Sequence, residues 1–575
     1  MMKTFRKLKE KQKIFESEFF VFDTETTPFE LNKVCKLIFG VVYGLDYKQV
    51  LYTENEYKAE FLKPMYKNKK VFAHNAEFDL NVIYGNIYEF DQKAIFNGKF
   101  ICATNGNCTF ADSMNIFPTS VKEIGKLIGL KKLELSKEFW SLSEVTGDDI
   151  IYCTRDCEII FNALAKMFEL AGNIKITVAG LSLDFFRRKY QSKNIDYNNE
   201  LSLKFFNSYY GGRCEAFKLG KCDAVVYDIN SMYPFAMVNA KFPNPKYLKR
   251  KTNISYENFR NRYLENYEGV IFCTVNHLQT YIGYLPYRLD GKLLFPVGNF
   301  TGWWNFNEIR YGIESGIIEI DGINEIIYSE PIDSPFAEYA NECYRLRFET
   351  TSEFNSYLYK LFANSLYGKF AQKIQYDEIY IQDMELQYKE ITAYKDKGLL
   401  IEICTFNEYR KDCFLKIKSN ETKYMANTIP LFSSYITSFA RVQLLTLLKK
   451  YENYEPIYCD TDSIFFNIDP DIKSSKKLGE FKKEKKIIKC INGLKNYDYI
   501  CENKANRKIK GIPKTAIEQD KKFTYFNLVK TREALRRNIK AGTQIERSKV
   551  IKHVYDKRTV YSNGETKAIH LYNDN

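Results

Sequence analysis

The sequence predicts a multidomain protein of mixed α/β and α+β class. Its 575 residues are enough for several domains with sizeable cores. Apolar runs such as residues 18–23 and 224–228 are typical of buried strands, and each ends in an acidic residue. Residues 148–160 instead carry the spacing of a helix. Near residue 170 this pattern changes, and we expect a domain boundary there.

The composition is that of a soluble globular protein with an excess of positive charge. Hydrophobic residues make up 45% of the chain and charged residues 27%. The formal net charge is +13, because 85 Lys and Arg outnumber 72 Asp and Glu. This excess suits a polyanionic partner. Aromatic side chains, which include 44 Tyr and 44 Phe, fill cores and also stack on unpaired bases.

The cysteine and histidine pattern predicts no zinc site. Fourteen cysteines and four histidines are scattered along the chain, and the closest pair, Cys153 and Cys157, has no partner pair at zinc-site spacing. Reduced thiols in a cytosol-like compartment are the simpler account. The apolar patch at residues 19–22 is too short for a signal peptide, and we expect no run long enough to span a bilayer.

Two carboxylates, Asp460 and Asp462, stand between apolar runs at residues 456–466. Alternate side chains of a strand share a face, so these two can point together, most easily at the tip of a hairpin. Like charges held that close repel unless a cation neutralises them, and carboxylates favour a hard ion such as Mg²⁺. A solvated acidic turn is the plainer alternative, but the apolar flanks favour a metal site.

Acidic residues also follow apolar runs in the first third of the chain. Asp23 and Glu25 share a face at the end of a strand, unless one of them is solvated. A second strand-like run brings Asp79, and a helical stretch places Tyr152 and Asp156, four residues apart, on one face. Each piece alone is weak evidence, because acidic residues are common.

The middle of the chain adds a third carboxylate to the later Asp-x-Asp pair. A buried strand delivers Asp228 at its end, and Pro234 is expected to stop the element that follows. Upstream, the sequence Tyr-Tyr-Gly-Gly-Arg at 209–213 lets a backbone approach a ligand closely, with Tyr and Arg as phosphate and base neighbours. Taken alone, that sequence is most often a turn.

A helix is predicted at residues 353–368, and Gly368 is expected to end it. Lys360, Asn364 and Tyr367 (or Gly368) recur at three- and four-residue spacing and therefore line one face. Such a face suits a phosphate beside a flat base, although an ordinary amphipathic helix has a polar side too.

Three of these patterns, in chain order, resemble the motifs of the DEDDy 3′–5′ exonucleases: Asp-x-Glu at 23–25, Asn-x-x-x-Asp at 75–79 and Tyr-x-x-x-Asp at 152–156. The resemblance implies a ribonuclease-H-like domain in which two metal ions support phosphodiester hydrolysis. The implied metal ligands are Asp23, Glu25, Asp79 and Asp156. Tyr152 would orient the attacking water, and the single-stranded 3′ end would meet Asn75, Phe78 and Ser113.

Three later patterns look like motifs A, B and C of family B DNA polymerases: residues 228–234, 360–368 and 458–463. The resemblance implies a right-hand polymerase of palm, fingers and thumb, with two Mg²⁺ ions per active site and Mn²⁺ able to substitute. The metal ligands would be Asp228, Asp462 and the Ile229 carbonyl, supported by Asp460. The incoming nucleotide would meet Tyr233, Arg345 or Arg347, Lys360, Asn364 and Tyr367. Template and primer would be held by Tyr209, Gly211, Gly212, Ser365, Gly368, Thr461, Lys495 and Tyr497.

Further details resemble the protein-primed branch of that family, found in phages, other viruses and linear plasmids. They are Tyr-x-Gly-Gly at 209–212, Thr-Thr-Ser-Glu at 350–353 and Lys-Asn-Tyr at 495–497. That branch carries one insertion that contacts a terminal protein and another that surrounds DNA for processivity and strand displacement. The expected order is therefore exonuclease 1–170, first part of the palm 171–240, first insertion 241–332, fingers 333–370, second insertion 371–430, second part of the palm 431–515 and thumb 516–575.

The resemblance thus predicts a protein-primed replicative DNA polymerase with proofreading. It is expected to act as a monomer on primer-template DNA, single-stranded DNA and deoxynucleoside triphosphates, in the host cytoplasm if it is phage or viral. The basic runs at 473–489 and 504–514 are expected to follow the DNA backbone, although a charge run is usually a solvated face. A conventional family B polymerase that needs no terminal protein is the alternative. A pure nuclease or a non-catalytic remnant fits less well, because both carboxylate sets are complete.

Overall fold

The structure is a computed structural model of the chain. The residues that it describes are 1–10, 15–87, 90, 92–96, 98–134, 144–381, 389, 391–393, 395–396, 400–407, 412–520, 522–537, 539–551 and 555–572.

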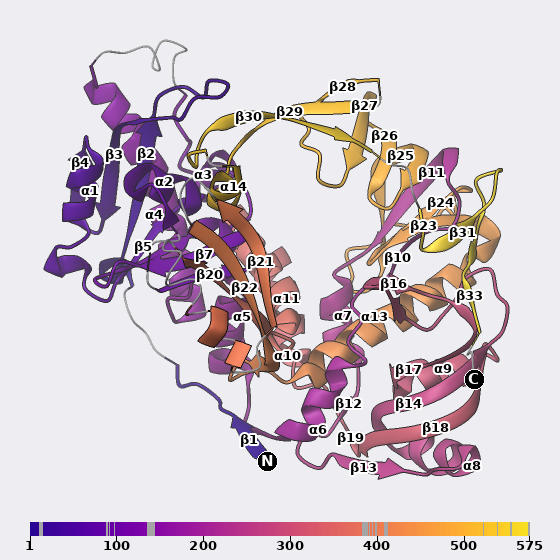
Figure 1. The fold of residues 1–575 in the computed structure, drawn as a ribbon. Helices are drawn as coiled ribbons and strands as arrows, with labels where there is room; N and C mark the ends of the chain where they lie inside the picture. Colours follow the sequence, from indigo (N-terminus) through magenta and orange to yellow (C-terminus); the bar gives the residue numbers. More distant parts are fainter. Residues whose placement is uncertain are drawn as a thin grey trace.

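The N-terminal domain is a seven-stranded sheet with helices on both faces (Figure 1). Strand β5 (Lys70–Ala73) lies at its centre, parallel to both of its neighbours, β2 (Phe19–Thr26) and β8 (Thr109–Asp112). The outer strands are antiparallel: β3 (Leu37–Gly44), β4 (Tyr47–Leu51), β6 (Gln92–Phe96) and β7 (Lys99–Thr104).

Strand β2 is apolar at successive positions because both of its faces are covered. Phe19 and Val21 join the core that contains helix α4 (Gly147–Ala171). Phe20 and Phe22 join a second core with helices α1 (Glu54–Glu60) and α2 (Ala76–Tyr84). Helix α4 begins at a capping box between Thr146 and Asp149 and ends next to the boundary expected near residue 170.

A second seven-stranded sheet, here called the central sheet, has the order β10-β23-β24-β11-β25-β26-β27. Its strands are β10 (Cys214–Ala216), β11 (Gly220–Ile229), β23 (Pro456–Asp460), β24 (Ser463–Phe466), β25 (Phe481–Gly493), β26 (Asn496–Cys501) and β27 (Lys504–Ile509). Helix α13 (Pro430–Lys450) supplies Ala440, Leu444 and Leu448 to the core on one face.

Helix α13 corrects one expectation from the sequence. By length and composition it could cross a membrane, whereas no run of that kind was expected. However, 72% of its apolar window is buried inside the protein. It therefore has the environment of a core helix, which satisfies the same criterion of length and hydropathy.

Helices α10 (Ala337–Glu349) and α11 (Glu353–Lys369) pack side by side, near the lower centre of Figure 1. They lie in the range expected for the fingers. Gly368 does not end the helix as predicted, since α11 continues to Lys369. Pro234 does not stop its element either, because it lies in the first turn of helix α7 (Met232–Asn239), where a backbone donor has no partner within the helix.

The first expected insertion is a separate antiparallel unit. Strands β12 (Phe242–Pro243) and β19 (Pro331–Ile332) pair at its neck, so the segment leaves and returns at one place. Its sheet contains β13 (Lys249–Thr252), β14 (Glu268–His277), β17 (Val297–Asn305) and β18 (Ile318–Ser329), packed with helix α9 (Phe306–Glu314). The second expected insertion forms a three-stranded sheet of β20 (Lys373–Ile381), β21 (Leu400–Asn407) and β22 (Asp412–Tyr424).

The region expected to be the thumb divides into two parts. Strands β28 (Ile517–Gln519), β29 (Lys522–Leu528) and β30 (Gln544–Val550) with helix α14 (Thr531–Arg537) form an arm that reaches the N-terminal domain (Figure 1). The remaining described residues turn back toward the central sheet. Strand β33 (His570–Leu571), within the range expected for the thumb, pairs with β17 of the first insertion.

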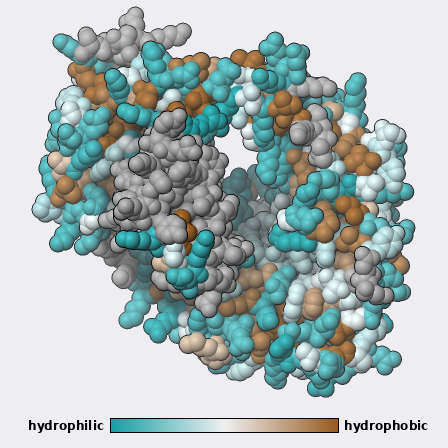
Figure 2. Space-filling model, in the orientation of Figure 1, coloured by the Kyte–Doolittle hydropathy of each residue, from teal (hydrophilic) through white to brown (hydrophobic). Residues whose placement is uncertain are grey.

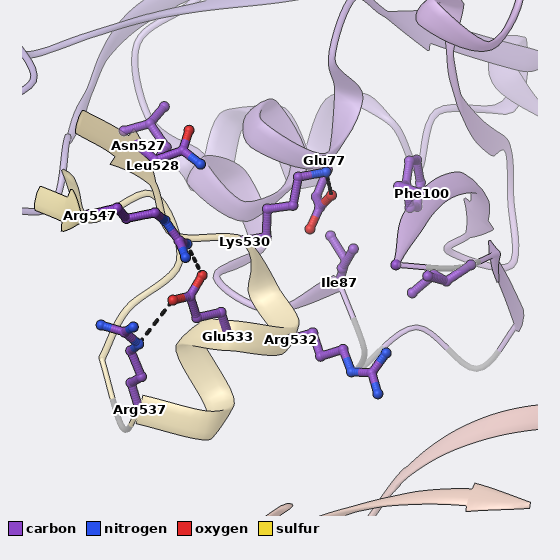
Figure 3. A pocket seen from close by; sticks show the side chains of 12 residues that line it. Glu77, Ile87, Phe100, Asn527, Leu528, Lys530, Arg532, Glu533, Arg537 and Arg547 are labelled. Carbon is purple, nitrogen blue, oxygen red and sulfur yellow. Dashed lines mark hydrogen bonds and ion pairs between the residues drawn. The ribbon is translucent and has the colours of Figure 1, made fainter. Parts of the chain in front are cut away.

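The arm is fixed to the N-terminal domain by polar contacts beside a pocket of about 430 Å³ (Figure 3). The Lys530 ammonium lies 3.2 Å from the Glu77 carboxylate, and the Thr531 hydroxyl hydrogen-bonds with Asn81. Figure 2 shows an opening through the molecule that the arm closes at the top. The described parts of the chain therefore encircle an opening between the N-terminal domain and the central sheet.

Candidate active sites

The first candidate site lies where strands of the central sheet end. Strands β23 and β24 are joined by a two-residue turn, Thr461 and Asp462, as the Asp-x-Asp pattern predicted for a hairpin tip. Thr461 has a φ of 63°, and its N–H donates to the Arg213 carbonyl at 2.7 Å. The hydrogen bond compensates for a backbone conformation that is unfavourable for a β-branched residue.

Three carboxylates meet at this edge of the sheet. Asp228 of β11 and Asp460 of β23 each stand beside Ser463, on opposite sides of β24. The N–H of Ile229 donates to the carbonyl of Asp462 at 2.6 Å, which fixes the hairpin tip against the end of β11. The strand ends therefore bring Asp228, Asp460 and Asp462 together, as hard divalent cations require of their ligands.

Glu484 adds a fourth carboxylate that was not singled out from the sequence. It lies on β25, in register near Asp228, and shares a hydrogen bond with it. Burial and the neighbouring Glu484 raise the pKa of Asp228 to about 7. The surrounding lysines of residues 482–486 conceal Glu484 in a charge run, so only the strand pairing reveals it.

Aromatic and glycine residues form one wall of this site. The rings of Tyr233 and Tyr367 stack with centroids 4.2 Å apart. A Cβ on Gly212 would lie 2.8 Å from the Tyr233 hydroxyl oxygen and 3.0 Å from Thr461 Oγ1. Gly212 is therefore needed for this close approach, and four of the predicted nucleotide and DNA residues converge: Gly212, Tyr233, Tyr367 and Thr461.

Cationic side chains form the other wall. Desolvation by the surrounding protein and the positive charges of Arg347 and Lys482 lower the pKa of Lys360. Arg345 is instead bound by Glu342 and Glu349 on its own helix, so Arg347 is the arginine that accompanies Lys360. The charges of Asp462 and Glu484 also act on Lys360, so this cationic cluster lies near the carboxylates.

The other residues predicted to contact DNA or nucleotide differ in their solvent exposure. Asn364 and Gly368 are exposed on α11, Ser365 is half-buried, and Tyr209 and Gly211 are half-buried beside Gly212. The Lys495 ammonium lies 3.2 Å from Asp460 Oδ2. Tyr497 is only 4% exposed and packs on Phe465, so the predicted contact of this residue with DNA cannot use the face of its ring.

Two buried arginines hold this site together. Arg213, expected from the sequence to neighbour phosphates, is 1% exposed and paired with Glu215, which corrects that expectation. Arg441 of α13 binds Glu308 of the first insertion and donates to the Gly211 carbonyl at 2.6 Å. Arg441 thus joins the glycine-containing loop to helix α9.

Arg441→Met is expected to lower the thermal midpoint of unfolding by about 3–4 °C, because it leaves Glu308 buried without its counter-charge, at a cost of about 3–5 kcal/mol. Glu308 is 0% exposed, and burial already raises its pKa. Scanning calorimetry of the whole protein measures the shift. Lys450→Met, at an exposed position of the same helix, is the control, and equal midpoints for the two variants would contradict the assignment.

The second candidate site lies on the N-terminal domain. Burial raises the pKa of Asp23 well above its usual range, and the charges of Glu25, Asp79 and Asp156 raise it further. Burial and the Asp156 charge raise the pKa of Glu25 to about 8, and burial raises that of Asp79 to about 7. These mutual effects show that four predicted carboxylates from β2, α2 and α4 lie close together.

Lys132 partly balances this negative charge. Its ammonium binds Asp156 Oδ2 and lies 4.8 Å from the centroid of the Tyr152 ring. The other oxygen, Asp156 Oδ1, is buried without a hydrogen-bond partner. The carboxylate oxygens of this cluster, one of them buried and unused, are ligands that suit a hard divalent cation. Lys132 was not singled out from the sequence, because it lies 24 residues from Asp156.

The residues around this cluster depart from expectation in two places. Asp79 does not lie on a strand but in the first turn of α2, which follows β5 through Asn75 at a φ of 74°. Ser113 is fully buried and hydrogen-bonded to His74 at 2.8 Å, so it has no surface to offer a DNA end. Asn75 is exposed and Phe78 half-buried, and the Phe78 ring lies 5.9 Å from that of Phe29.

Comparison with known proteins decides the family. Residues 130–467, more than half of the chain, match the family described as "DNA polymerase type B, organellar and viral". The chain belongs to this family. Members of the family use divalent metal ions, and carboxylate oxygens such as those of the two clusters are suitable ligands for them.

Curated polymerases from fungi and a phage are among the similar sequences. The "Probable DNA polymerase" of Podospora anserina is 28% identical over 415 residues, which are 63% of this chain and 32% of that protein. The "DNA-directed DNA polymerase" of Enterobacteria phage PRD1 is 26% identical over 465 residues, 79% of this chain and 77% of the phage protein. The chain thus spans about a third of the fungal relative but most of the phage relative.

Solved structures of Phi29 DNA polymerase share the fold. The complex with primer-template DNA and incoming nucleotide has a TM-score of 0.69 and 17% identity, and it covers 93% of this chain and 99% of that chain. The complex with single-stranded DNA has a TM-score of 0.66 and 18% identity, with 93% and 100% covered. The architecture expected from the sequence, an exonuclease-like domain joined to a right-hand polymerase, is confirmed as a fold.

Proposed function

We propose that the chain is a DNA-directed DNA polymerase with a 3′–5′ proofreading exonuclease. The observation that carries this proposal is the convergence of Asp228, Asp460 and Asp462 at the ends of adjacent strands, with Lys360 and Arg347 nearby. The separate carboxylate cluster around Asp23 supports the second activity. Partners would be primer-template DNA, single-stranded DNA and deoxynucleoside triphosphates, which a monomer would bind in the host cytoplasm.

At the central sheet, Asp228, Asp460, Asp462 and the Ile229 carbonyl would hold two Mg²⁺ ions, with Mn²⁺ able to substitute. Such ions activate the attacking 3′-oxygen and stabilise the pyrophosphate leaving group. Lys360 and Arg347 bind the triphosphate, which relieves the repulsion between these two cations. The stacked Tyr233 and Tyr367 provide the surface on which the new base pair and its sugar are oriented.

At the N-terminal domain, Asp23, Glu25, Asp79 and Asp156 would hold the ions of the exonuclease. Tyr152 orients the water that attacks the phosphodiester, and Lys132 fixes Asp156 and lies against the Tyr152 ring. Asn75, at the exposed start of α2, and the neighbouring Phe78 would contact the unpaired 3′ end.

The two activities are tested together on one 5′-labelled primer annealed to a longer template. With Mg²⁺ and all four deoxynucleotides the primer should lengthen, and without nucleotides the same primer should shorten from its 3′ end. Shortening under both conditions would contradict the polymerase proposal and support only a nuclease. If the primer did not shorten without nucleotides, the proposed proofreading activity would be contradicted.

Replacement of Arg347 by Ala is expected to raise the KM for deoxynucleotides about 10–100-fold, because a charge-assisted contact with the triphosphate is lost. Arg345→Ala is the matched control, since Arg345 is held by Glu342 and Glu349. Steady-state extension of a primed template measures the KM for deoxynucleotides in both variants. A larger effect at Arg345 would reverse the assignment.

We further propose that synthesis starts on a terminal protein rather than on a nucleic-acid primer. The first insertion supports this proposal, because it leaves and returns at a narrow neck and packs around a core that it shares only with Leu445 among the buried members, a form suited to contact a protein. A conventional polymerase that extends ordinary primers is the alternative. The arm that contacts the N-terminal domain favours the protein-primed polymerase, because a chain that encircles DNA suits synthesis through duplex DNA.

A further inference from the structure

A buried thiol belongs to the carboxylate cluster of the N-terminal domain. Cys153 follows Tyr152 on α4, is 0% exposed, and its Sγ lies 3.9 Å from Asp23 Oδ2. One ligand atom each from Asp23, Glu25 and Cys153 lie within 4.8 Å of one another. The thiol therefore stands where a ligand to a cation would stand, beside two carboxylates from β2.

A second observation shows that this cluster contains a potential ligand atom without a hydrogen-bond partner. Asp156, one turn further along α4, has a side chain that is 9% exposed. Lys132 binds its Oδ2, whereas Oδ1 is buried without a partner. The charge of Asp156 acts on Glu25 more than that of any other group, so the Asp156 carboxylate belongs to the same cluster.

The thiol changes which cations the cluster should prefer. Mg²⁺ takes oxygen ligands and gains nothing from sulfur, whereas thiolate ligands select soft or borderline ions such as Zn²⁺. Zinc bonds of about 2.3 Å to sulfur and about 2.0 Å to oxygen at a tetrahedral angle place two ligand atoms about 3.5 Å apart. The separation of 3.9 Å between Cys153 Sγ and Asp23 Oδ2 needs only a small adjustment.

We propose that Asp23, Glu25 and Cys153 form a binding site for a thiophilic divalent cation of the Zn²⁺ class, which displaces Mg²⁺ and blocks exonucleolytic cleavage. As the metal–sulfur bond forms, the S–H bond breaks and its proton passes to solvent, with no change of oxidation state. The inhibitory part of this proposal rests on the proposed exonuclease function, whereas the metal site itself does not. The zinc-site search by sequence spacing missed it, because the ligands come from segments about 130 residues apart.

Cd²⁺ is the probe, because a cadmium–thiolate bond gives a charge-transfer band in the ultraviolet. The full chain is titrated with CdCl₂ without Mg²⁺, as wild type, Cys153→Ser, Cys153→Ala and Cys157→Ser. Cys157→Ser is the control for the neighbouring thiol: Cys157 is also buried on α4 and shares a hydrogen bond with Cys153, but it is not one of the three residues whose ligand atoms lie within 4.8 Å of one another. The titration should show a tightest-binding phase in this band. We expect the Cd²⁺ affinity of that phase to fall at least about tenfold in both Cys153 variants and to be retained in Cys157→Ser.

A second readout is degradation of single-stranded DNA in Mg²⁺, with each variant's rate in added ZnCl₂ divided by its own rate without it. Wild type and Cys157→Ser should be inhibited at Zn²⁺ concentrations at least about tenfold lower than the Cys153 variants. An unchanged band in both Cys153 variants, or equal loss in Cys157→Ser, would overturn the metal site. A Cys153-dependent band in a chain that never degrades DNA would support the metal site and overturn the exonuclease proposal.

Discussion

Asp228→Ala should abolish primer extension while single-stranded DNA is still degraded. Asp228 ends β11 beside the hairpin that carries Asp460 and Asp462, so its loss removes a ligand for the ions that stabilise developing charge. Such stabilisation is worth several kcal/mol, and we expect the extension rate to fall more than about a thousandfold. Single-turnover extension of a labelled primer measures the loss, and degradation of the same labelled strand serves as the internal reference.

The matched control for this change is Asp223→Ala. Asp223 lies on the same strand, but its side chain is 75% exposed and pairs with Lys489 at the surface. The control should extend primers at the rate of the unchanged protein. If Asp228→Ala still extended primers, or if the control lost as much activity, the central sheet would not be the site of synthesis.

Asp23→Ala should abolish degradation and leave extension measurable. Asp23 is a member of the N-terminal cluster whose pKa is raised by the charges of Glu25, Asp79 and Asp156, and its removal disrupts the ligand set for the ions that activate water. We again expect a loss of more than about a thousandfold in the rate of degradation. Asp148→Ala, at an exposed position in the first turn of α4, is the control. Loss of both activities in Asp23→Ala would mean misfolding or a wrong site.

The isosteric variant Asp23→Asn gives a readout that is independent of activity. In EDTA it should unfold at a higher temperature than wild type, because one member of a mutually repelling cluster has been neutralised. The raised pKa values mean that wild type loses stability as pH rises from about 4, where free carboxyls titrate, through about 8. The advantage of Asp23→Asn should therefore be largest near pH 8 and vanish near pH 4. Added Mg²⁺ should raise the midpoint of wild type more than that of the variant.

Local patterns in the sequence predicted the acidic residues but not all of their supports. Asp23, Asp228 and Asp460 could be found because apolar runs that end in acids are a local signal. Glu484 could not, since its partner Asp228 is more than two hundred residues away and only the pairing of β11 with β25 brings them together. Arg213 and Ser113 were assigned to surfaces for the same reason, because burial depends on packing partners that spacing does not reveal.

Backbone conformation and distant strand pairing escaped prediction for a similar reason. The run that ends at Asp79 reads as one strand, yet Asn75 adopts a left-handed conformation and begins helix α2. Strand β33, within the range expected for the thumb, pairs with β17, which lies more than 250 residues earlier. Nothing in residues 555–572 alone indicates that pairing.

The most direct test of the account is extension of a primed single-stranded circle with Mg²⁺ and deoxynucleotides, with no accessory protein. We predict products many times the length of the circle, because the arm and the N-terminal domain would keep the chain around the DNA while it displaces the strand ahead. Products that stop at one circle would contradict strand displacement and favour a conventional polymerase. No extension from a preparation that degrades DNA would contradict the central claim that this chain synthesises DNA.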